Sequence, residues 1–128
     1  MFIIRIDNPI RYHRYLLSDP FFCCYATFAL PSLCPDPLCY QQHGKCKTFA
    51  INYRLAPQHP FPAALVDALA AYLYITNPPE NAGFKPVDVA QLVMAGDSAG
   101  GGLVLATALA IRDLNLPAAA GIIALSPW

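Results

Sequence analysis

Apolar residues follow a regular plan only in the second part of the chain. From residue 48 onward, short apolar runs at residues 48–53, 91–95 and 121–125 alternate with longer helix-forming runs at residues 63–75 and 100–112. Strands that alternate with helices in this way are typical of βαβ units around a parallel sheet. The pattern predicts an α/β fold in three layers, with at least three parallel strands and right-handed crossovers.

The individual runs add detail to this plan. Residues 63–75 carry leucines at every fourth position, which predicts one apolar stripe along a helix. Residues 91–95 are apolar at successive positions, the pattern of a strand that is buried on both faces. Residues 100–112 are apolar on nearly every side, so we expect that helix to lie in the interior against the sheet.

Residues 1–46 show no sustained period of 2 or 3.6 and are rich in proline, so no element is predicted there. We therefore divide the chain into an irregular segment, residues 1–46, and a partial α/β domain, residues 47–128. The apolar run at residues 21–30 is about half the length that a membrane helix needs, and charged residues interrupt the first nine positions. We expect no membrane span, no signal peptide and a cytoplasmic location.

Composition and cysteine spacing argue against nucleic-acid binding and against a zinc site. Charged residues make up 12% of the chain, about half the usual share, and eight basic residues balance eight acidic ones. No segment concentrates like charges, which argues against nucleic-acid binding. All five cysteines lie between Cys23 and Cys46, with His43 near the last, but their spacing matches no common zinc site. We expect free thiols and no metal site.

Between the second predicted strand and the helix after it lies a G-x-S-x-G motif, Gly96-Asp97-Ser98-Ala99-Gly100. At such a junction the motif holds a serine hydroxyl above the sheet, and the glycines avoid collisions between strand and helix. A phosphate-binding loop or a plain turn is the alternative. The loop lacks the P-loop lysine and the dinucleotide-binding spacing, so a nucleophile is favoured. The Ala99 N–H would then be one oxyanion donor.

Three blocks of sequence carry a family resemblance. They are residues 52–57 (NYRLAP), residues 96–101 (GDSAGG) and residues 125–128 (LSPW), in this order. With them, residues 48–128 resemble the hormone-sensitive lipase (GDXG) family of α/β-hydrolase-fold carboxylesterases. The resemblance implies a partial α/β-hydrolase core and hydrolysis of small carboxylic esters without a cofactor. It also implies Ser98 as the nucleophile and Ala99 as an oxyanion donor.

The sequence departs from this family at three of its catalytic features. The family's HGGG-type oxyanion loop is represented only by His43-Gly44, close before the NYRLAP block. The family places its acid and its histidine after the nucleophile. After Ser98 the chain has no histidine, and its only carboxylate is that of Asp113, at the end of a predicted helix.

Other titratable residues do not replace the missing ones. We expect His59 to have a structural role, His13 and His43 to be solvated, and Asp67 and Asp97 to accept hydrogen bonds from loop backbone.

These features predict a fragment of a longer serine esterase, from a truncated or misassembled reading frame, that is nearly inactive by itself. The alternative is a non-catalytic ligand-binding or interaction protein on the same scaffold. The natural ester and the oligomeric state stay open.

Overall fold

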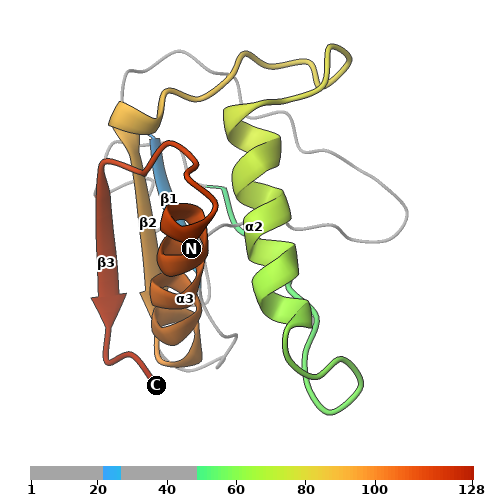
Figure 1. The fold of residues 1–128 in the computed structure, drawn as a ribbon, viewed down its shortest axis with the longest axis vertical. Helices are drawn as coiled ribbons and strands as arrows, with labels where there is room; N and C mark the ends of the chain where they lie inside the picture. Colours follow the sequence, from blue (N-terminus) through green and yellow to red (C-terminus); the bar gives the residue numbers. More distant parts are fainter. Residues whose placement is uncertain (1–21, 27–48) are drawn as a thin grey trace.

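The computed structural model describes residues 22–26 and 49–128 (Figure 1). The elements in chain order are strand β1 (Phe22–Ala26), helix α2 (Ala63–Thr76), the 3-10 turn η1 (Val89–Gln91), strand β2 (Leu92–Asp97), helix α3 (Ala99–Asp113) and strand β3 (Gly121–Leu125).

The three strands form one parallel sheet in the order β1-β2-β3. Strand β2 is central, and its Met94 pairs in register with Cys24 of β1 and Ile122 of β3. Helix α3 connects β2 to β3 and packs along them, while α2 lies beside α3 (Figure 1). The predicted α/β fold with a parallel sheet is confirmed.

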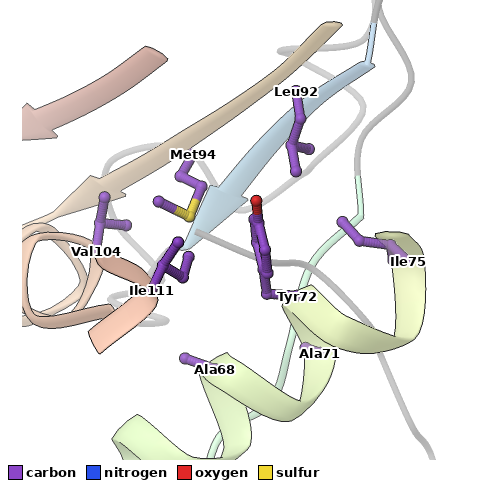
Figure 2. Packing of buried hydrophobic residues seen from close by; sticks show 8 residues of the cluster. All are labelled: Ala68, Ala71, Tyr72, Ile75, Leu92, Met94, Val104 and Ile111. Carbon is purple, nitrogen blue, oxygen red and sulfur yellow. The ribbon is translucent and has the colours of Figure 1, made fainter. Parts of the chain in front are cut away.

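The core lies between β2 and the two helices. Figure 2 shows side chains of α2 and α3 directed toward Leu92 and Met94 of β2. Leu92 and Met94 are two positions apart, so both helices cover the same face of the sheet. The described residues therefore supply the sheet and one helical layer of the expected three. The buried cluster consists of Ala68, Ala71, Tyr72, Ile75, Leu92, Met94, Val104 and Ile111.

Strand β1 lies where the sequence predicted no element. Its FCCYA sequence is apolar at successive positions and does not alternate apolar with polar residues, so a period of 2 gave no signal. The boundary near residue 46 stays a prediction, although β1 lies before it and pairs with β2 after it.

The strand predicted at residues 48–53 is wrong, because only Ala50 forms a β-bridge within residues 49–53. Directly after this run, the backbone N–H of Arg54 donates to a carboxylate oxygen of Asp67 at 2.9 Å, so it is not available to a strand partner. The chain then turns, with the His59 N–H bonded to the Leu55 carbonyl at 2.9 Å.

Helix α3 is less buried than its sequence predicted. Val104, Thr107 and Ile111 are buried toward the core, but Leu105 and Leu109 on the other side are 42% and 51% exposed. An apolar helix sequence thus predicts that the helix packs against other elements, but it does not predict which face stays exposed to solvent. In the part of the chain that the structure describes, no helix has the length and hydropathy to cross a membrane.

Candidate active site

Ser98 is the single residue between β2 and α3. Its backbone has φ 52° and ψ −121°, and its side chain is exposed. A positive φ is uncommon for a residue with a Cβ, and holding one costs about 1–3 kcal/mol. The structure therefore places Ser98 on the sharp strand-to-helix turn that the sequence predicts.

Gly96 and Gly100 lie where the strand meets the first turn of the helix. A Cβ on Gly96 would be 2.1 Å from the carbonyl oxygen of Gly100 and 2.8 Å from the backbone nitrogen of Gly101. No side chain fits in that space, since real Cβ atoms keep at least about 3 Å from such atoms. The predicted need for glycine at position 96 is confirmed.

Ala99 and Asp97 flank the serine. Ala99 is the first residue of α3, and N–H groups at this end of a helix have no carbonyl one turn earlier to bind. This end of a helix carries partial positive charge, which favours a negative charge nearby. Asp97 ends β2, half-buried and paired in register with Leu125. Its expected hydrogen bonds to loop backbone stay a prediction.

The last residue of β3 and the residues after it lie against the same turn. The Ser98 N–H donates to the Leu125 carbonyl at 2.9 Å, and the Trp128 N–H donates to the Ser98 carbonyl at 3.1 Å. A Cβ on Gly102 would be 2.2 Å from the Trp128 carbonyl oxygen. The motif by itself does not predict these contacts. The two glycines that follow the motif, Gly101 and Gly102, were the available signal.

Asp67 is held in an ion pair on α2. Its carboxylate accepts bonds from Arg54 at 3.0 Å from Nε, 2.7 Å from Nη2 and 2.9 Å from the backbone N–H. The expectation that Asp67 bonds loop backbone is confirmed. The hydrogen bonds from the Arg54 guanidinium hold the pKa of Asp67 below its ordinary value.

Asp113 lies at the far end of α3 from Ser98. Its carboxylate pairs with neighbouring Arg112 at 2.7 Å, and both side chains are exposed. The 15-residue helix is roughly 20 Å long at about 1.5 Å per residue, so Asp113 is out of reach of the serine. His59 lies exposed in the loop before α2.

Several predicted features lie outside the described residues. They include His13, the His43-Gly44 pair and most of the cysteine group. Among the residues that the structure does describe, no three His, Cys, Asp or Glu side chains gather as a metal site would require.

Comparisons with known proteins agree with this geometry. Residues 30–128 match the model of a family described as having the alpha/beta hydrolase fold. An acetyl-hydrolase of Streptomyces hygroscopicus is 42% identical over 79 residues, which are 62% of this chain and 24% of that protein. The chain spans about a quarter or less of the length of the curated relatives it matches, for example 24%, 20% and 22% of three of them.

Solved structures show the same likeness in three dimensions. An esterase/lipase from an uncultured bacterium superposes with a TM-score of 0.66 at 33% identity, over 86% of this chain and 38% of that one. An esterase of the bacterial hormone-sensitive lipase family gives a TM-score of 0.63 at 30% identity, over 84% of this chain and 36% of that one. The chain therefore belongs to the α/β-hydrolase fold family, within its hormone-sensitive lipase type.

Proposed function

We propose that this chain carries the nucleophile of a carboxylic ester hydrolase, and that the nucleophile is Ser98. The observation that carries the proposal is the backbone of Ser98, at φ 52° on the turn between β2 and α3. A fold keeps a strained residue where the strain is useful, and here it presents a hydroxyl at the start of a helix. The names of the relatives, an acetyl-hydrolase and two esterases, support the same reaction class.

The proposed chemistry follows from that position. Ser98 Oγ bonds to the acyl carbon of an ester while its proton passes to a general base. The Ala99 N–H, at the positive end of α3, stabilises the oxyanion of the intermediate. The alcohol leaves with the base's proton, and water then releases the carboxylic acid and restores the serine.

We infer that the described part of the polypeptide supplies no relay for this proton. No histidine follows Ser98 in the sequence, Asp67 is paired with Arg54, and Asp113 is roughly 20 Å away. Loss of a triad member lowers turnover by about 10⁴- to 10⁶-fold. We therefore expect the isolated polypeptide to be nearly inactive unless an external base is supplied.

The test has two parts. First, the purified polypeptide is assayed on p-nitrophenyl acetate and butyrate, and turnover that depends on Ser98 at ordinary esterase rates would contradict the expected inactivity. Second, the polypeptide is incubated with a fluorophosphonate in concentrated imidazole, which serves as the external base, and the modified residue is identified by mass spectrometry.

The matched control for labelling is Ser126. It is also an exposed serine with a positive φ, 41°, but it does not begin a helix. We expect the mass spectrum of the parent to show the label on Ser98 and not on Ser126, and we expect the label to be lost in Ser98→Ala. Labelling that survives Ser98→Ala would remove the proposed nucleophile.

A second candidate function is an interaction module without catalysis, and the exposed apolar side chains of β3 favour it. Ile122, Ile123 and Leu125 are each 44% to 46% exposed, an unusual state for strand residues of this kind. Light scattering over a range of concentrations tests it. A mass that rises with concentration, together with an unreactive Ser98, would favour this candidate over the hydrolase.

A further inference from the structure

We propose that the backbone of residues 125–128 is a clamp that positions Ser98 for reaction. The clamp consists of the Leu125 carbonyl and the Trp128 N–H, which act as positioning groups and touch no substrate. The inference rests on the proposed role of Ser98 and adds the device that holds it ready.

The two bonds of the clamp act on both sides of the strained residue. The Leu125 carbonyl accepts from the Ser98 N–H at 2.9 Å, and the Trp128 N–H donates to the Ser98 carbonyl at 3.1 Å. The first bond fixes the peptide group before Ser98, and the second fixes the one after it. Holding both peptide planes fixes the two torsion angles between them, φ 52° and ψ −121°. The clamp thus opposes relaxation of the turn into an unstrained conformation.

The first turn of α3 is shaped to admit the clamp. A Cβ on Gly101 would be 3.0 Å from Pro127 Cα, and a Cβ on Gly102 would be 2.2 Å from the Trp128 carbonyl oxygen. Glycine is among the poorest helix formers, so two of them inside α3 are costly for the helix. The close approach of residues 125–128 explains why glycine is present at both positions.

The clamp works through main-chain groups. The Trp128 side chain is 91% exposed, so its indole is not what holds the segment in place. Ser126 bends the chain with φ 41°, and the two ends of the segment then both reach Ser98. A variant that keeps the Trp128 backbone should therefore keep the clamp, whereas loss of the residue should remove it.

The experiment compares three polypeptides: the 128-residue chain, Trp128→Ala and a chain that ends at Pro127. Each is labelled with a fluorophosphonate in imidazole, and the rate at Ser98 is measured. We expect Trp128→Ala to react at the parent rate. The chain without Trp128 should react about threefold to tenfold more slowly, the factor that one net hydrogen bond supplies.

Gly102→Ala provides a second perturbation at full chain length. Alanine favours the helix, so a purely structural role for position 102 predicts equal or greater stability and unchanged labelling. The clamp predicts slower labelling at Ser98 in Gly102→Ala, because its Cβ displaces the Trp128 carbonyl. Circular dichroism and the thermal midpoint establish that each variant is folded as the parent is.

Hydrogen exchange of the Ser98 amide separates the clamp from the proposed function. The clamp predicts faster exchange in the chain without Trp128 and parent-like exchange in Trp128→Ala. If this exchange pattern is found but no polypeptide is labelled, the clamp is supported and only the role of Ser98 as nucleophile is refuted. Equal labelling and equal exchange in all variants would overturn the clamp. A fall in the labelling rate of Trp128→Ala as large as that in the chain without Trp128 would also overturn it.

Discussion

The contact between the end of β2 and the start of α3 makes Gly96→Ala the sharpest test of the fold. The added Cβ would be 2.1 Å from the Gly100 carbonyl oxygen and 2.4 Å from the Gly100 carbonyl carbon. These are backbone atoms of a helix, and no side-chain rotation relieves the collision. Helix and strand must separate by nearly 1 Å, because such contacts are not found below 3.0 Å.

The magnitude follows from what moves with the helix. Overpacking costs about 1–3 kcal/mol when flexible groups absorb it, and here a shift of α3 also disturbs buried Val104 and Ile111. We expect Gly96→Ala to lower the free energy of unfolding by about 3 kcal/mol. For a domain of this size that corresponds to a fall in Tm of roughly 10 °C.

Gly121→Ala is the matched control. A Cβ there would meet only the Val93 side chain, with Cγ2 at 3.7 Å and Cγ1 at 4.0 Å, which are ordinary contacts, and Gly121 does not have a positive φ. Reduced freedom of the unfolded chain should raise its stability by about 0.4–1 kcal/mol. Urea denaturation measures both variants. A Gly96→Ala variant within about 1 kcal/mol of the parent would refute the close contact at the turn.

Three further variants test other parts of the structure. Ser98→Gly should raise the free energy of unfolding by about 1 kcal/mol, because glycine adopts a positive φ freely; Ser98→Ala should not, and equal effects in denaturation would contradict strain at this residue. Tyr72→Phe removes the hydroxyl that bonds the α3–β3 connection and should cost about 1 kcal/mol in the same assay; no change would discount that bond. Because Arg54 lowers the pKa of Asp67, the pair stabilises the fold above about pH 4 and loses this effect as the pH falls through the lower folded value. Asp67→Asn should therefore destabilise at pH 7 and progressively less in acid, and a pH-independent effect in thermal melts would contradict the pairing. Asp113→Asn removes an exposed ion pair and should change the stability at pH 7 very little.

The helices and two of the three strands could be predicted because their apolar patterns are local. The helix predicted at residues 63–75 is α2, the one at residues 100–112 is α3, and the strand at residues 121–125 is β3. Strand β1 could not be predicted, because what defines it is pairing with β2, far along the chain. The run at residues 48–53 failed in the opposite way, because its composition favours a strand but only Ala50 finds a bridge partner.

The position of Ser98 was predictable for a related reason. The strand, the turn and the helix around it are adjacent in sequence, so the motif and its surroundings are visible together. The bonds to Leu125 and Trp128 join residues that are 27 and 30 positions from Ser98. Nothing in the motif specifies which distant backbone will approach it. The extra glycines indicate only that some group does.

The exposed edge of β3 has a consequence for assembly. No charged residue lies between Asp113 and the end of the sequence, so this edge lacks the charges with which many proteins deter a neighbouring strand. Among the described strands, β3 has a partner on one side only. A polypeptide strand that pairs with β3 at this edge would make β3 more rigid. Strand β3 continues directly into residues 125–128, whose backbone groups bond to Ser98. Binding at this edge of the sheet would then be coupled to the reactivity of Ser98.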